Sequence, residues 1–80
     1  MKKIRLKIYK LEGEEEYLID KITLPTYLGQ ITILPNHQPL LCLLEKGTII
    51  FWEEEKKNEI LVEREAFARI NQKLVEIFLV

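Results

Sequence analysis

The 80-residue chain contains no serine, one cysteine and one histidine. The absence of serine excludes a serine nucleophile, and a single cysteine can form neither an internal disulfide bond nor a cysteine-rich zinc site. A lone histidine supplies no cluster of imidazole ligands for a metal ion. The three glycines, Gly13, Gly29 and Gly47, are isolated from one another and form no phosphate-binding loop. The composition therefore argues against an enzyme, a metal centre and a bound cofactor.

An excess of charge of either sign is also missing. Lysine and arginine number 12 and the acidic residues 13, which gives a net charge of −1. A basic footprint for nucleic acid and a polybasic membrane anchor are both disfavoured by this balance. No apolar run approaches the ~20 residues of a membrane span, and Arg5 and Lys7 interrupt the apolar residues that a signal peptide would need. We expect a protein that stays in the cytoplasm, where a single reduced thiol is ordinary.

The dominant pattern in the sequence is an alternation of apolar and polar residues with a period of two, which predicts β-strands. Hydrophobic residues make up 48% of the chain and charged residues 31%, as in folded globular domains. The predicted strands cover residues 4–8, 17–24, 31–33, 40–44, 48–53, 60–62, 67–70 and 74–79. We therefore expect residues 1–80 to form a single all-β domain, a flattened two-sheet β-sandwich or barrel of about 8–10 short strands.

Several segments between these strands carry their own predictions. Residues 12–16, with adjacent carboxylates around a glycine, are interpreted as a solvent-exposed loop. Residues 54–58 are interpreted as the polar loop of a β-hairpin. Pro25 is expected to end the second strand, because proline has no N–H group to donate. Residues 63–74 also have the apolar spacing of an amphipathic helix, which remains the alternative to strands there.

Few of the polar residues form a pattern typical of catalysis or metal binding. His37 and Cys42 lie five residues apart, but a cysteine–histidine pair also needs a third group that orients the base. Cys42 lies in the apolar segment 40–44, where a lone cysteine is typically a small core or interface residue. Glu53, Glu54 and Glu55 could approach a hard cation, but calcium loops space their ligands at alternate positions. An exposed hairpin tip is the favoured interpretation.

The most unusual segment spans residues 24–44 and contains all three prolines and the only histidine. Proline fixes the φ angle, so the loop between Pro35 and Pro39 is expected to be stiff. Such a loop presents the polar residues 36–38 beside the apolar segment 40–44. Because a stiff loop loses little conformational entropy on binding, this arrangement favours docking to another protein.

This segment resembles the N-terminal domain of the epsilon subunit of F-type ATP synthases, which is called delta in mitochondria. The family pattern is close to leucine-proline, a short turn and then Gly-Glu-Ile-Gly-Ile-Leu-Pro-Gly-His-Ala-Pro-Leu-Leu. Here it stands as Leu24-Pro25 and then Gly29-Gln30-Ile31-Thr32-Ile33-Leu34-Pro35-Asn36-His37-Gln38-Pro39-Leu40-Leu41. The similarity extends to residues 20–24, 46–47, 67–70 and 74–77, and so covers essentially the whole chain.

Three departures from the family pattern bear on the prediction. Gln30 stands where the family has an acidic residue, and Asn36 stands where it has a glycine. Asparagine also tolerates a positive φ angle, so the loop can keep its shape. Glu65-Ala66 replaces a common glycine pair, so that turn must be built differently.

The resemblance implies the β-sandwich fold and a non-catalytic role without cofactor, metal or small-molecule substrate. It implies a central-stalk (rotor) subunit that couples the gamma subunit to the membrane c ring during proton- or sodium-driven ATP synthesis. Such a subunit lies peripherally at the cytoplasmic face of the cell membrane. Most bacterial relatives add a C-terminal helical hairpin that inhibits ATP hydrolysis, and we expect this hairpin to be absent here. The alternative is a stand-alone β-sandwich that binds other proteins and is unrelated to ATP synthase.

The matched family positions put the turn at Gln30 and the loop of residues 35–39 at the rotor contact. The partner-binding residues predicted for the gamma subunit and the c ring are Gln30, His37, Gln38, Leu40 and Cys42. Gln30 offers a neutral hydrogen-bonding group where the family offers a charge. His37 has a second predicted role, in which it ties its own loop through a hydrogen bond to the backbone. The two roles are compatible.

Overall fold

The computed structural model describes residues 2–79, and within this range all regular secondary structure is β-strand. The strands are short and follow one another closely along the chain. Their bounds are β1 Ile4–Lys10, β2 Gly13–Ile19, β3 Lys21–Thr26, β4 Gly29–Ile33, β5 Leu40–Leu44, β6 Gly47–Glu53, β7 Lys56–Val62, β8 Ala66–Ile70 and β9 Leu74–Phe78.

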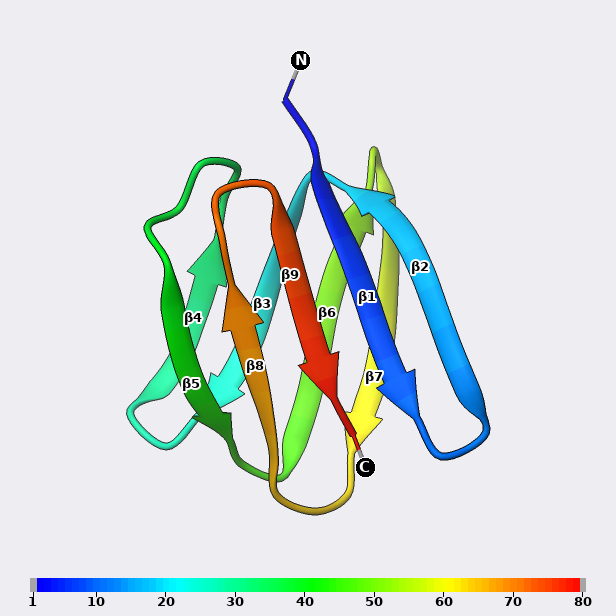
Figure 1. The fold of residues 1–80 in the computed structure, drawn as a ribbon, viewed down its shortest axis with the longest axis vertical. Helices are drawn as coiled ribbons and strands as arrows, with labels where there is room; N and C mark the ends of the chain where they lie inside the picture. The colour runs from blue at the N-terminus through cyan, green and yellow to red at the C-terminus, as the bar shows by residue number, and fades with distance from the viewer. Residues whose placement is uncertain (1, 80) are drawn as a thin grey trace.

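The strands form one sheet that folds over on itself into two layers (Figure 1). The front layer has the order β2-β1-β9-β8-β5, and the rear layer contains β3, β6 and β7, with β4 added beside β3. The layers meet where β5 pairs with β3 at Leu44 and Thr26. Next to this pair, the amide of Glu45 donates a hydrogen bond of 2.8 Å to the carbonyl of Pro25. In the front layer, β1 and β9 pair in parallel, which joins the two ends of the chain.

The core lies between the layers and follows from the alternation in the sequence. In β1, Leu6 and Ile8 point inward and are fully buried, whereas Arg5 lies on the opposite face and is exposed. Phe51 of β6 is the one aromatic ring among the largest fully buried side chains, and the others are isoleucines and leucines. Burying one such side chain stabilises the fold by roughly 1.5–3 kcal/mol. The apolar core is therefore the main source of stability.

The structure confirms the all-β prediction, and the helical alternative for residues 63–74 is wrong, because this segment forms β8 and the turn to β9. The predicted loop at residues 12–16 is also wrong in part. Glu14, Glu15 and Glu16 lie in β2, where they pair with β1. Arg5 and Lys10 of β1 form ion pairs with Glu16 (2.8 Å) and Glu15 (3.1 Å). These cross-strand cations offset the repulsion between the carboxylates, which is why a strand is possible there.

Three further boundaries differ from the prediction. The segment 17–24 is two strands separated by a corner at Asp20, whose carboxylate accepts hydrogen bonds from Lys3 Nζ (2.5 Å) and the Glu54 amide (2.6 Å). Pro25 lies inside β3, where its carbonyl accepts a hydrogen bond and no N–H is needed. The hairpin loop between β6 and β7 is only two residues long, with Glu54 in a left-handed conformation at φ 58°.

Two leucines separate the contribution of the core from that of the surface. The substitution Leu6→Ala removes a fully buried side chain and should lower the free energy of unfolding by about 2–5 kcal/mol. Leu18→Ala is the matched control, because Leu18 is 58% exposed, and its effect should stay within about 0.5 kcal/mol. Urea denaturation of both variants measures the difference. Equal losses in the two variants would contradict the assignment of the core.

Candidate docking surfaces

The loop between β4 and β5 is held in a defined conformation. Asn36 adopts a left-handed conformation with φ 68°, as expected for the residue that replaces a glycine. Its amide donates a hydrogen bond of 2.8 Å to the carbonyl of Gln72, which ties the loop to the turn between β8 and β9. His37 Nδ1 lies 2.7 Å from the carbonyl of Gln38, so the imidazole donates to its own loop. The second predicted role of His37 is therefore confirmed.

The five predicted partner-binding residues do not form one continuous surface. Gln30 lies at the start of β4 and His37 lies beyond its end, so the two are at opposite ends of the strand (Figure 1). Because a strand rises about 3.3 Å per residue, β4 alone separates them by roughly 10 Å or more. His37, Gln38 and Leu40 lie together at one end, and Cys42 follows in the middle of β5. The family pattern is continuous along the sequence, but β4 carries the chain from one end of the sandwich to the other within it. The two ends of β4 therefore present different predicted residues.

The end of the sandwich that carries Gln30 has a rigid turn. The Thr26 hydroxyl donates a hydrogen bond of 2.6 Å to the carbonyl of Gly29 and accepts one of 3.2 Å from the amide of Leu28. The Tyr27 hydroxyl hydrogen-bonds to the carboxylate of Glu65 in the loop between β7 and β8. These contacts fix the turn while the Leu28 side chain remains 98% exposed. The turn therefore presents an apolar tip beside the polar side chain of Gln30.

The side chains of β5 divide between the two faces of the front layer. Leu40 and Cys42 share the inner face with the buried Leu44 and are themselves only partly covered. Burial raises the pKa of the Cys42 thiol, so the thiol is protonated and unreactive near neutral pH. Leu41 and Leu43 point outward and are 68% and 63% exposed. The outer face of β5 is thus apolar and exposed.

A row of apolar side chains that the sequence analysis missed crosses the outer face of the front layer. We define the aromatic strip as Leu43 on β5, Phe67 on β8, Phe78 on β9 and Tyr9 on β1, which are neighbours in register. The rings of Phe67 and Phe78 stack with centroids 4.6 Å apart, and those of Phe78 and Tyr9 with centroids 4.8 Å apart. The outward parity of these residues could be read from the sequence. Their proximity could not, because it depends on the order of the strands.

The carboxylate of Glu76, beside the aromatic strip, orients the Tyr9 hydroxyl and the Arg69 guanidinium. Glu76 of β9 accepts hydrogen bonds from Arg69 Nε (2.8 Å) and from the Tyr9 hydroxyl (2.9 Å). Glu76 is only 8% exposed. Desolvation raises its pKa, but the bonds from Arg69 and Tyr9 outweigh this effect, and the pKa of Glu76 lies below its usual value. Glu76 thereby orients Tyr9 and Arg69, whose guanidinium lies 5.8 Å from the centroid of Phe78.

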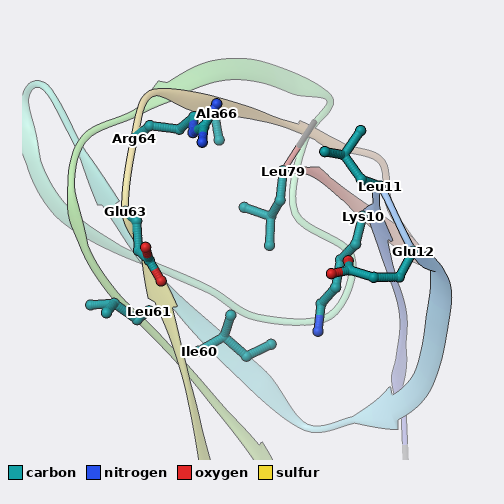
Figure 2. Close-up of a pocket in the computed structure, with 9 residues that line it drawn as sticks. All are labelled: Lys10, Leu11, Glu12, Ile60, Leu61, Glu63, Arg64, Ala66 and Leu79. Atoms are coloured by element: carbon teal, nitrogen blue, oxygen red, sulfur yellow. The ribbon is translucent and has the colours of Figure 1, made fainter.

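A hollow of about 330 Å³ opens at the end of the sandwich where β1 turns into β2 (Figure 2). Ile60 and Leu79 point into it, and charged side chains surround it. Its lining residues are Lys10, Leu11, Glu12, Ile60, Leu61, Glu63, Arg64, Ala66 and Leu79. Between residues 2 and 79 no cluster of histidine, cysteine or acidic side chains suited to a metal ion occurs, and no helix is long and apolar enough to cross a membrane.

These features define a β-sandwich with exposed apolar surfaces. The family model of the β-sandwich domain of the ATP synthase delta/epsilon chain matches residues 3–79. The chain belongs to this family, which confirms the resemblance found in the sequence and excludes a β-sandwich unrelated to ATP synthase.

Relatives and solved structures agree with this assignment. The chain is 30% identical over 78 residues to the ATP synthase epsilon chain of Campylobacter concisus, covering 96% of this chain and 60% of the relative. It is 37% identical over 49 residues to the epsilon chain of Bdellovibrio bacteriovorus, covering 61% of this chain and 32% of the relative. The chain thus spans at most about 60% of the length of these relatives.

Two solved assemblies contain chains with the same fold. In the Euglena gracilis mitochondrial ATP synthase (OSCP, F1 and c-ring), a chain of 22% identity superposes with a TM-score of 0.88, covering 98% of this chain and 51% of that one. In the central stalk and c-ring of the Tetrahymena thermophila mitochondrial ATP synthase, the identity is 15% and the TM-score 0.77, with coverages of 98% and 65%. At these identities the matches establish the fold.

The lowered pKa of Glu76 predicts how acid affects stability. A carboxylate whose pKa is lower in the folded chain stabilises it above the usual value of 4.5, and this contribution is lost as the pH falls through the folded pKa. As the pH is lowered below about 4.5, the free energy of unfolding of the wild-type chain should therefore decrease. Glu76→Gln should make this decrease with pH less steep. Urea titrations at several pH values measure it. Glu55→Gln, at the exposed hairpin tip, is the control, and the same flattening in both variants would contradict the prediction.

Proposed function

We propose that the chain is a non-catalytic central-stalk (rotor) subunit of an F-type ATP synthase, which couples the gamma subunit to the c ring during ion-driven ATP synthesis. The family match over residues 3–79 is the observation that carries this proposal. The fold match to chains of assemblies that include a c-ring supports it. In this role the chain lies peripherally at the cytoplasmic face of the membrane.

The chemistry of the described residues supports a non-catalytic role. The imidazole of His37 donates its Nδ1 hydrogen to the adjacent backbone. The raised pKa of Cys42 leaves a neutral thiol, which is a poor nucleophile. What the surface offers instead is a stacked aromatic strip and an exposed leucine tip, which suit docking to a protein.

We assign the gamma subunit to the outer face of the front layer. Phenylalanine, tyrosine and arginine are enriched in the buried centres of protein interfaces. The aromatic strip supplies such residues, and Arg69 lies directly beside it. Because stacking and the Glu76 hydrogen bonds already order these side chains, little entropy is lost on binding. His37 and Gln38 precede β5 at the border of this face, whereas Leu40 and Cys42 point to the inner side of β5 and are assigned no contact there.

We assign the c ring to the end of the sandwich where β4 begins, away from His37. Leu28 and Gln30 lie at this end. The matched family position of Gln30 supports this assignment. The hydrogen bonds of Thr26 make the turn rigid, and a rigid turn can transmit a force from a partner to the sandwich. The separation of Gln30 from His37 along β4 allows the two partners to bind at the same time.

The assignment of the gamma subunit predicts a charge effect on the aromatic strip. Leu43→Asp places a carboxylate among apolar contacts and should weaken binding of the isolated gamma subunit by about tenfold or more, as at interface hot spots. Leu18→Asp is a matched control, since Leu18 is similarly exposed on the same layer but lies away from the strip. Titration of labelled gamma measures both affinities. If Leu43→Asp folds normally and binds gamma as tightly as wild type, the surface is misplaced.

The neutral side chain of Gln30 predicts a weak salt dependence at the ring. Charges at an interface mainly set the association rate and its sensitivity to salt. Gln30→Glu restores the family's carboxylate. The rate of association of this variant with the purified c ring should depend more steeply on salt concentration than the rate of wild type. Stopped-flow measurements over a series of salt concentrations test this. Gln38→Glu, at the other end of β4, should leave the salt dependence at the ring unchanged.

A further inference from the structure

Two turns at the same end of the sandwich carry leucines that the fold does not explain. Leu11 lies in the two-residue turn between β1 and β2 and is 87% exposed, and Leu28 lies in the two-residue turn between β3 and β4 and is 98% exposed. Both turns lie at the lower end in Figure 1. Tight turns favour glycine, asparagine, aspartate, serine and proline for their backbone conformations. Leucine provides no such advantage, and these side chains pack against almost nothing in the chain.

The surface between the two tips is hollowed. The hollow in Figure 2 begins at Leu11 and reaches Arg64. A second hollow, of about 440 Å³, is lined by residues that include Arg64 and Tyr27, the neighbour of Leu28. Because Arg64 lines both, the depression runs from one leucine tip to the turn that carries the other. The end of the sandwich thus has two apolar projections with a depression between them.

The charges of this end indicate what kind of surface it meets. The two hollows are lined by three cations and four carboxylates, which are Lys10, Lys46, Arg64, Glu12, Glu45, Glu63 and Glu65. An anionic lipid surface attracts clusters of lysine and arginine, and this balance provides no such cluster. The charges around the two apolar projections are therefore of mixed sign. The observations therefore favour a protein partner over a bilayer.

We propose that the Leu11 turn is a second contact with the c ring, in addition to the turn that carries Leu28. The inference rests on the proposed function, in which Leu28 and Gln30 meet the ring. The two leucines would contact the ring as separate projections, with the hollows of this end between them. Contact at two points prevents the chain from pivoting about one tip, which a rotor part needs in order to turn with the ring.

The test compares leucine substitutions at three exposed positions. Binding of the full chain to the purified c ring in lipid nanodiscs is measured for wild type, Leu11→Asp, Leu28→Asp and the control Leu18→Asp. We expect Leu11→Asp and Leu28→Asp each to weaken binding by about tenfold, the effect of removing one interface hot spot, and Leu18→Asp to leave it unchanged. Leu11→Asn, which suits a turn, serves as a second variant. Circular dichroism melting confirms that each variant is folded.

A photo-crosslinking residue at position 11 identifies what the tip touches. Crosslinks to the ring subunit support the proposal, and crosslinks to lipid would overturn it in favour of membrane contact. If Leu28→Asp weakens binding and Leu11→Asp and Leu11→Asn do not, the second contact is wrong while the proposed function stands. If wild type binds neither the ring nor the gamma subunit, the proposed function fails as well.

Discussion

The parallel pairing of β1 with β9 is the contact on which the rest of the structure depends. It lies in the middle of the front layer and joins the β1–β2 hairpin to the β9-β8-β5 half. It also brings Tyr9 next to Phe78 and within hydrogen-bonding distance of Glu76. A pairing between the two ends of a chain is the least local contact available, and its entropic cost must be met by burial of the core beneath it. The core therefore packs on one face of the β1–β9 pair, and the aromatic strip lies on the other face.

The period of two lets one strand serve the core and the surface at once. In β5, Leu44 is buried while Leu43, its neighbour, stands in the aromatic strip. The same division separates Leu6 from Arg5 in β1. A small domain has little interior, so nearly every strand must contribute to both faces. This division of each strand explains how a short chain can form a buried core and still expose several apolar surfaces.

The parts of the fold that the sequence predicted are those that depend on local patterns. Alternation identified most strands, and Asn36 could be expected to take the glycine conformation, as it does. The strand at Glu14–Glu16 was missed because its stabilising partners, such as Arg5, lie on another strand. The separation of Gln30 from His37 depends on the direction of β4, and the aromatic strip depends on strand order. Neither is encoded by spacing along the chain.

The link between the two layers has a mechanical consequence. Among the described residues, β3 and β5 share a single residue pair, Thr26 with Leu44, whereas neighbouring strands elsewhere pair over several residues. A force on one layer is therefore carried to the other by few sheet hydrogen bonds, and the connecting segments and the packed side chains of the core carry the rest. Close-packed interiors have low compressibility, so they transmit strain with little loss. Phe51 and the side chains packed around it therefore resist displacement of one layer relative to the other, in addition to forming the hydrophobic core.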